Sequence, residues 1–228
     1  ACNRNAVSLS YTNAKGEVPQ LGNLVFRFSQ SMIADSLLNN WDSSAYISFS
    51  PSIKGRFRWE SPDQLVFSPM QPLDPANSYT ASINSEVLRF SKYDKVEGGN
   101  KISFHTPGLR LDDARVIWIG ESGASAQPQL DLYFNYRVNP ADIKEKLKVE
   151  VENKEAAYDV ITTNADNRIS IRINGIKTED KDYAVSVKLT KGLKPAVGTN
   201  STADPITTSL SIPSPYVLTI LASEAEHD

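Results

Sequence analysis

The chain has 228 residues, of which 40% are hydrophobic and 22% charged, a composition typical of a folded globular protein. The formal net charge is −3, and neither half of the chain is basic: 10 basic residues face 9 acidic ones before Gly108, and 14 face 18 from Gly108 onward. A nucleic acid is therefore excluded as an expected partner. No apolar run approaches the roughly 20 residues that a membrane-spanning helix needs.

The N-terminus carries the one cysteine of the chain, within Ala1-Cys2-Asn3. A small residue before a cysteine is typical of the end of a bacterial lipoprotein signal, in which the cysteine receives a lipid; the apolar leader expected before it would already have been removed. We expect Cys2 to be lipidated and to tether the chain to a membrane surface. The alternative is a terminal cysteine without a role. One cysteine excludes an internal disulfide and a Cys₂His₂ zinc site.

Short segments in which apolar and polar residues alternate dominate the first hundred residues. Residues 25–28, 57–59 and 79–83 are examples. Alternation with period two is typical of half-buried antiparallel strands, because successive side chains point to opposite faces. We expect residues 1–108 to form a β-sandwich with Arg27 and Arg58 at solvent or at an edge. Its expected core contains Phe26, Phe28, Trp59, Phe67, Tyr79 and Ile83.

Two short helices are the expected exceptions to the all-β pattern. Residues 32–38 and 140–147 each follow a matched strand. Pro140 and Asp142 suit a first helical turn, because proline needs no hydrogen-bond acceptor there and the acid complements the helix dipole.

The second half of the chain repeats the first at a nearly constant offset. Segments 132–134, 169–171 and 183–187 follow segments 26–28, 65–67 and 79–83 by 104–106 residues. A repeat of this length indicates a duplicated domain rather than a solenoid unit. We expect a second sandwich over residues 109–215, after a boundary at Pro107-Gly108. Its expected core contains Leu132, Phe134, Val149, Val151, Ile171, Tyr183 and Val187.

The last residues, 216–228, contain a further apolar segment at 217–221. It is similar to residues 116–119 and 7–11, which are expected to begin the two sandwiches. Two interpretations remain open: the segment is the first strand of a truncated third unit, or it completes the second sandwich.

Candidate catalytic and metal-binding residues are few. The histidines are His105, in an expected closing strand, and His227, in an acidic tail. Carboxylates cluster at Asp112-Asp113 and at residues 179–182, and both clusters are expected to be solvated turns rather than Ca²⁺ sites, because no calcium-loop spacing surrounds them. We expect no catalytic residue, no metal and no cofactor.

The three tryptophans have two alternative roles. Trp41, Trp59 and Trp118 suit either a sugar-binding platform or the packed core of a sandwich. Trp59 shares a strand face with Phe57, which favours the core. Trp41 is flanked by Asn39-Asn40 and Asp42, and is therefore the candidate for exposure.

Several of these segments together resemble a bacterial immunoglobulin-like module. They are Phe26-x-Phe28-Ser29-x-x-Met32, Phe57-x-Trp59, Leu65-x-Phe67-x-Pro69 and Leu73-x-Pro75-x-x-x-Tyr79. With Cys2 and the tandem units, the chain resembles the N-terminal macroglobulin domains of bacterial alpha-2-macroglobulin-like lipoproteins, of the type found in Bacteroides.

The resemblance implies a broad-spectrum protease trap in the cell envelope, in the periplasm or on the outer-membrane surface. In that family, proteases cut a bait region and an internal thioester in a Cys-x-Glu-Gln motif captures them. This chain lacks the motif, since Asn3-Arg4-Asn5 follows Cys2. It is therefore expected to supply tether and scaffold, with the rest of a longer chain as its partner. The alternative is the immunoglobulin-like stalk of an adhesin or glycan-binding protein.

Overall fold

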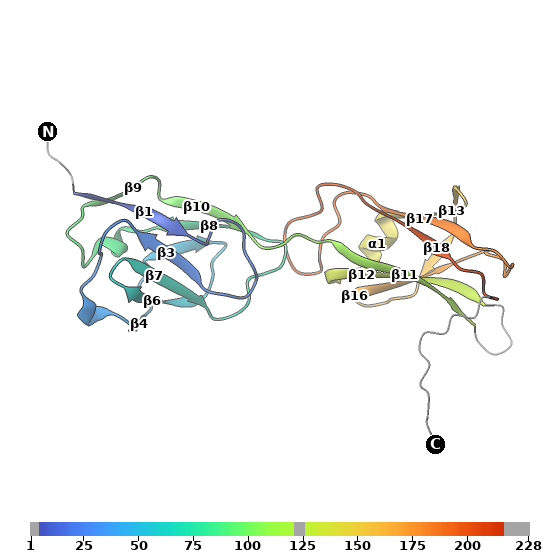
Figure 1. The fold of residues 1–228 in the computed structure, drawn as a ribbon, viewed down its shortest axis with the longest axis horizontal. Helices are drawn as coiled ribbons and strands as arrows, with labels where there is room; N and C mark the ends of the chain where they lie inside the picture. The colour runs from blue at the N-terminus through green and yellow to red at the C-terminus, as the bar shows by residue number, and fades with distance from the viewer. Residues whose placement is uncertain (1–4, 121–125, 217–228) are drawn as a thin grey trace, which may run out of the picture. The chain divides into compact units, whose positions relative to one another are not determined.

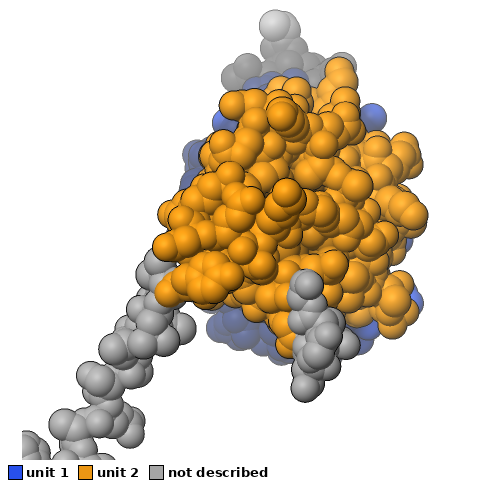
Figure 2. All heavy atoms as spheres, turned by 90° about the vertical axis from the view of Figure 1, so that its right-hand side faces the viewer, with its two compact units in different colours: residues 1–108, 197–200 blue, residues 109–196, 201–228 orange. Residues whose placement is uncertain are grey.

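The computed structural model describes residues 5–120 and 126–216. Within these ranges the chain forms two compact units. The first comprises the residues up to Gly108 together with Val197–Asn200, and the second comprises Leu109–Ala196 and the residues from Ser201 onward (Figure 2). Each unit has its own buried cluster of apolar side chains. The fold is all-β, as the alternation predicts.

The first unit is a sandwich of two sheets (Figure 1). One sheet has the order β4-β6-β7-β3-β1-β9. Its strands are β1 (Ala6–Thr12), β3 (Leu24–Phe28), β4 (Trp41–Asp42), β6 (Gly55–Ser61), β7 (Gln64–Pro69) and β9 (Lys95–Glu97). The other sheet has the order β2-β10-β8-β5. Its strands are β2 (Gly16–Glu17), β5 (Ile47–Ser50), β8 (Ser78–Ile83) and β10 (Lys101–His105). Of two short 3₁₀ turns, η1 (Asp35–Leu37) lies between β3 and β4 of the same sheet, and η2 (Ser85–Leu88) connects β8 of one sheet to β9 of the other.

The second unit is a sandwich of two four-stranded sheets, with the orders β11-β12-β16-β15 and β14-β13-β17-β18. The first of these sheets contains β11 (Leu111–Ile119), β12 (Gln127–Val138), β15 (Tyr158–Val160) and β16 (Asp166–Ile173). The second contains β13 (Leu147–Val151), β14 (Lys154–Glu155), β17 (Tyr183–Leu189) and β18 (Ile206–Ile212). The helix α1 (Pro140–Lys146) bridges β12 and β13, and its buried Ile143 packs into the core.

The core positions predicted from alternation are confirmed. All thirteen side chains named above are buried, and the burial pattern of β17 alternates along its whole length. The short helices are confirmed as η1 and α1. Arg27 is exposed as predicted, whereas Arg58 is only partly exposed because Trp41 covers it. Strand pairing is mainly antiparallel, as expected, and the first unit adds two short parallel pairs, β9 with β1 and β2 with β10.

The two units share strand order and register over their matched strands: β6-β7-β3-β1 corresponds to β15-β16-β12-β11, and β5-β8-β10 corresponds to β13-β17-β18. Phe26 pairs with Leu65, and Leu132 pairs with Ile169, which are the matched positions of the sequence repeat. The first strand of each unit is also bulged at the same place: the register shifts after Leu9 opposite Phe28, and after Leu111 opposite Phe134. A bulge is a specific feature, because it inserts one unpaired residue at a fixed point of a ladder. The structure therefore matches Leu9 with Leu111, and not residues 7–11 with 116–119.

A tyrosine closes one corner of each unit. The Tyr79 hydroxyl accepts a hydrogen bond from the Asp74 backbone N–H at 3.0 Å, and the Tyr183 hydroxyl donates one to the Lys177 carbonyl at 3.0 Å. Both rings are buried and both hydroxyls tie down the loop that precedes the strand. The arrangement is that of a tyrosine corner, in which the side chain fixes a connection that crosses the sandwich. The sequence comparison placed these tyrosines at equivalent positions.

Candidate functional site

Two of the residues proposed for function lie outside the described residues. They are Cys2, the expected lipidation site, and His227. The segment 217–221, with its two interpretations, also lies there. His105 lies in the closing strand β10, as expected, and is exposed. Its Nδ1 is 3.1 Å from the Thr106 carbonyl, and its cross-strand neighbour is Ser78.

The carboxylate clusters have structural surroundings. The expected turn at Asp112-Asp113 is wrong: both residues belong to β11, where Asp112 is the extra residue of the bulge. The two carboxylates pair with Arg110 and Arg115 at 2.7 and 2.6 Å. Aspartate is uncommon in strands, but a bulge in a strand at the edge of a sheet leaves its side chain in water.

Residues 179–182 form the expected loop before β17. Asp180 accepts a hydrogen bond from the Ser214 hydroxyl at 2.7 Å, and Asp182 accepts one from the Ser214 backbone N–H at 2.8 Å. These carboxylates therefore anchor the segment after β18. Over residues 5–120 and 126–216, no group of three or more histidine, cysteine or acidic side chains is placed to hold a metal ion.

The tryptophans divide as their flanking residues suggested. Trp59 is buried in the first core. Trp118 is partly buried, and its indole N–H donates to the Pro213 carbonyl at 2.7 Å. Trp41 keeps 45% of its surface exposed. Trp41 shares a cavity with two other exposed apolar side chains, Leu37 and Phe90, and clustered exposed apolar residues mark interaction sites, so its surroundings define the candidate site.

A cavity of about 220 Å³ opens beside Trp41, and we call it the Trp41 pocket. Its exposed rim is formed by Leu37, Asn40, Trp41 and Phe90, and its buried wall by Ile33, Tyr46 and Trp59, with Asp42 between them. These residues come from η1, β4, β6 and the segments before β5 and after η2. Trp41 and Asp42 are neighbours on β4, the edge strand of its sheet, so their side chains point to opposite faces of the sheet. Both line the pocket, because the pocket lies at this edge of the sheet.

Polar groups converge on the pocket wall. The Tyr46 hydroxyl donates to Asp42 Oδ2 at 2.6 Å, and the Ser44 backbone N–H donates to Asp42 Oδ1 at 2.7 Å. Desolvation raises the pKa of Asp42, but these hydrogen bonds outweigh it, and the pKa lies below its usual value. Asp42 is therefore ionised at neutral pH. Burial first, and the Asp42 carboxylate second, raise the pKa of Tyr46 to about 12.

The indole N–H of Trp59 has no hydrogen-bond partner, although the nitrogen is buried. The Tyr46 hydroxyl is nearby, and Trp59 lowers its pKa, although burial and Asp42 have larger and opposite effects. The indole N–H and the hydroxyl nevertheless do not form a hydrogen bond. A buried donor without an acceptor is costly, and such groups call for a structural or functional explanation. Trp59 lines the Trp41 pocket, so its N–H is a candidate donor to a ligand.

Two arginines hold the Trp41 ring. The guanidinium groups of Arg58 and Arg56 lie 4.7 and 5.7 Å from the ring centroid. Arg58 is the cross-strand neighbour of Trp41 and is also paired with Glu60. Cation–π contacts of this kind stabilise an exposed ring by about 0.5–1 kcal/mol. Trp41 is therefore a positioned platform and not a freely rotating side chain.

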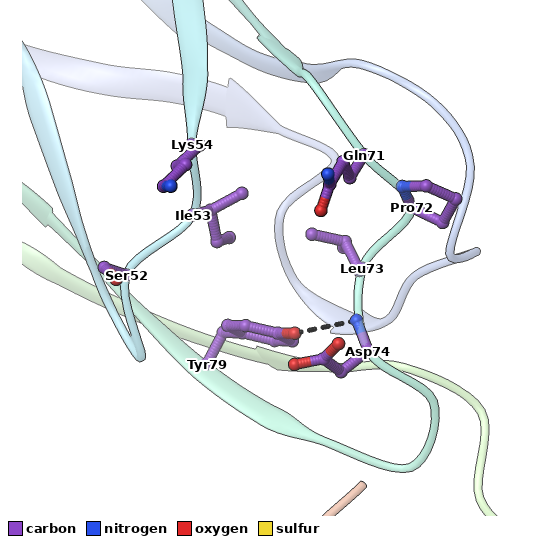
Figure 3. Close-up of a pocket in the computed structure, with 8 residues that line it drawn as sticks. All are labelled: Ser52, Ile53, Lys54, Gln71, Pro72, Leu73, Asp74 and Tyr79. Carbon is purple, nitrogen blue, oxygen red and sulfur yellow. Dashed lines mark hydrogen bonds between the residues drawn. The ribbon is translucent and has the colours of Figure 1, made fainter. Parts of the chain in front are cut away.

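A second cavity, of about 240 Å³, lies beside Tyr79 (Figure 3). Ile53 and Leu73 face each other across it, and the Tyr79 hydroxyl points to the Asp74 backbone N–H. The Tyr79 ring and Asp74, which form the tyrosine corner, line one side of this cleft. The three buried side-chain nitrogens without a partner in the described chain belong to Arg58, Trp59 and Arg172, none of which lines this cleft. We therefore regard the Trp41 pocket as the stronger candidate site.

Sequence reasoning singled out Trp41 but not the residues around it. Leu37 and Phe90 are 41% and 50% exposed and complete the apolar rim, while Tyr46 supplies the hydroxyl. Leu37, Tyr46 and Phe90 are far apart in the chain, so no local sequence pattern predicts that they lie together. The one available signal was the cluster of polar residues around Trp41 in an otherwise alternating sequence.

Comparisons with known proteins give no family. No family model and no curated protein matches the chain. The matching solved structures include an L,D-transpeptidase from Mycobacterium tuberculosis H37Rv, at 12% identity, with 74% of this chain and 76% of that chain covered and a TM-score of 0.30. At this TM-score the likeness carries no argument for this chain. In the described part of the chain, no helix has the length and apolar character needed to cross a bilayer.

Proposed function

We propose that this chain is a non-catalytic scaffold and tether of a cell-envelope alpha-2-macroglobulin-like protease inhibitor. Its two sandwiches are, on this proposal, tandem immunoglobulin-like macroglobulin domains. Cys2 carries the lipid anchor, and further macroglobulin domains of a longer chain contact the proteases.

The observation that carries the proposal is the duplication. Both units have the same strand order around the matched strands, the same register at Phe26 and Leu132, and the same bulge after Leu9 and Leu111. Duplicated sandwiches in series are the architecture on which such inhibitors mount their functional parts. Phe26, Phe28 and Met32, three residues of the motif that carries the resemblance, are fully buried together in the first core, which supports the proposal.

Separate cores suit a scaffold. The buried cluster of the first unit draws on residues between Val7 and Phe104, and that of the second on residues between Leu109 and Ile212. Apolar burial contributes about 25 cal/mol per Å², so units with their own cores keep their own stability. Independently stable units can hold attached domains in place, and this role needs no catalytic group.

The test compares the purified 228-residue chain with the longer polypeptide that we propose surrounds it. Each is incubated with subtilisin, and hydrolysis of a large protein substrate and of a small peptide substrate is measured. The longer polypeptide should block access of the large substrate only, and the 228-residue chain should protect neither. A covalent complex between subtilisin and the 228-residue chain would contradict the scaffold role. A longer polypeptide without any protective effect would contradict the trap.

The tether is tested separately with Cys2→Ser. In the source bacterium, the chain with Cys2 should fractionate with membranes and incorporate labelled palmitate. The Cys2→Ser variant should lose both properties. Membrane association that persists in the variant would refute the anchor.

The second candidate function is the stalk of a surface adhesin or a glycan-binding protein. Exposed Trp41 beside a pocket with polar groups favours this alternative. Binding of intact cells or immobilised glycans by the longer polypeptide, without protection of subtilisin substrates, would favour the adhesin over the trap.

A further inference from the structure

The Trp41 pocket has no part in a scaffold or a tether. It lies in the first unit, beside the edge strand β4. Its combination of an exposed platform, an ionised acceptor and a buried free donor is specific enough to define a ligand. We propose that the Trp41 pocket binds a neutral pyranose ring of a saccharide.

The aromatic rim suits the apolar side of a sugar. Trp41 and Phe90 each expose about half of their surface at the mouth of the cavity. The C–H groups on one side of a pyranose ring pack on such surfaces, and the burial of apolar area drives the contact. Arg56 and Arg58 fix the Trp41 ring, so little side-chain entropy is lost on binding.

The polar wall suits the hydroxyl side of the same sugar. Each Asp42 oxygen accepts one hydrogen bond within the protein, and a carboxylate oxygen has capacity for a second. The Trp59 indole N–H needs an acceptor. A hydroxyl group both donates and accepts, so adjacent hydroxyls of one ring satisfy Asp42 and Trp59 together.

The charges around the pocket disfavour ionic ligands of either sign. A cation would be attracted by the aromatic rings and Asp42 but repelled by the two guanidinium groups within 6 Å of Trp41. An anion would approach these arginines but would meet the Asp42 carboxylate at the wall. A neutral hydroxylated ring incurs neither penalty.

The volume limits the ligand to one ring. At about 220 Å³ the cavity is smaller than the roughly 300–1,000 Å³ typical of sites for drug-sized molecules. A larger glycan would place one residue in the pocket and extend into solvent. For a single ring we expect a dissociation constant of about 1–10 mM.

The experiment is a titration of the 228-residue chain followed by tryptophan fluorescence and by calorimetry. The probes are maltotriose, mannotriose, galactobiose and chitotriose, with sialic acid and tetramethylammonium as anionic and cationic comparisons. Chitotriose represents N-acetylhexosamine glycans such as those of cell walls, and the others represent storage and surface glycans. At least one neutral saccharide should saturate the signal, and it should bind more tightly than either ion.

Three variants locate the site. Trp41→Ala removes an exposed platform and should weaken binding by about tenfold or more. Trp59→Phe keeps the aromatic packing, removes the N–H donor, and should weaken binding by about two- to tenfold. Trp118→Phe, in the second unit, is the matched control and should bind like the unchanged chain. Circular dichroism verifies that each variant is folded.

Three results would overturn the proposal. One is the lack of saturation by every neutral saccharide up to about 100 mM. Another is unchanged affinity in folded Trp41→Ala. The third is tighter binding of sialic acid or tetramethylammonium than of any neutral probe. None of these results bears on the protease assay, so the scaffold proposal stands or falls independently.

Discussion

Replacing Gly55 by alanine should destabilise the first unit severely. Gly55 begins β6 and pairs with Pro69 of β7. A Cβ atom there would lie 2.5 Å from the Ser68 carbonyl oxygen and 2.6 Å from Phe67 Cε2, with Phe67 Cζ closer still. Real Cβ contacts essentially never fall below 3.0 Å. The penalty is one of space and not of backbone conformation, since the φ angle of Gly55 is not in the left-handed region.

The neighbours of Gly55 have little room to move. Phe67 is fully buried, with ring centroids of Phe49 and Phe57 at 4.6 and 4.8 Å. The Ser68 oxygen belongs to the backbone of a central strand. Overpacking of a filled core costs about 1–3 kcal/mol, and a clash that also pushes two paired strands apart belongs at the upper end. We expect a loss of about 3 kcal/mol in the free energy of unfolding, which lowers the melting temperature by about 10 °C or more.

The assay is urea and thermal unfolding in a Trp118→Phe background, where Trp41 and Trp59 report on the first unit alone. Gly108→Ala is the matched control, because no atom lies within 4 Å of its added Cβ and its φ angle is also ordinary. The control should change stability by less than about 0.5 kcal/mol. A Gly55→Ala protein as stable as the control would refute the packing of β6 against Phe67 described here.

Three further changes test other parts of the structure. Asp131 is buried and its carboxylate pairs with Arg168 at 2.7 Å, while Arg168 is half exposed. Asp131→Ala should therefore lower the free energy of urea unfolding by about 2 kcal/mol. A loss below about 0.5 kcal/mol would contradict the contribution of this ion pair. Tyr183→Phe removes the corner hydrogen bond and should cost about 1 kcal/mol in the same assay, whereas an unchanged midpoint would show that the corner is dispensable. The pKa of Tyr46 is raised from 10.0 to about 12, so the folded state holds this proton more tightly than the unfolded state and loses stability as the pH rises from 10 to about 12. Tyr46→Phe should therefore show a shallower loss over that range, and parallel pH curves for the two proteins would refute the buried pair with Asp42.

Local patterns predicted the faces of strands well. In β8 and β17 the side chains alternate between the core and the surface, so the apolar positions of the sequence identified the buried residues directly. The tyrosine corners were also predictable in position, because Tyr79 and Tyr183 stand at matching points of the repeat. The hydrogen bonds that the two hydroxyls make were not, since one accepts from a backbone N–H and the other donates to a carbonyl.

Patterns failed where the partner of a residue decides its structure. Asp112 has low strand propensity and was expected in a turn, but Phe134 and Tyr133 on the neighbouring strand extend β11 through it with a bulge. Val197–Asn200 belong to the first unit, because Asn200 and Thr199 hydrogen-bond to the Ala76 carbonyl, at 2.7 and 3.2 Å. Nothing in the local sequence of this segment indicates that partner.

The candidate site shows the same division. Trp41 was identifiable from its polar neighbours in the sequence, because polar flanking residues are a local sign that an aromatic side chain is exposed. The pocket was not, because Leu37, Tyr46, Trp59 and Phe90 meet Asp42 only after the layers of the first sandwich close. The sequence by itself determined the all-β fold, the repeat and the core, since side-chain alternation is a local property. Tertiary structure alone decided the parallel strand pairs, the unpaired Trp59 donor and the pocket, since these depend on contacts between residues far apart in the chain.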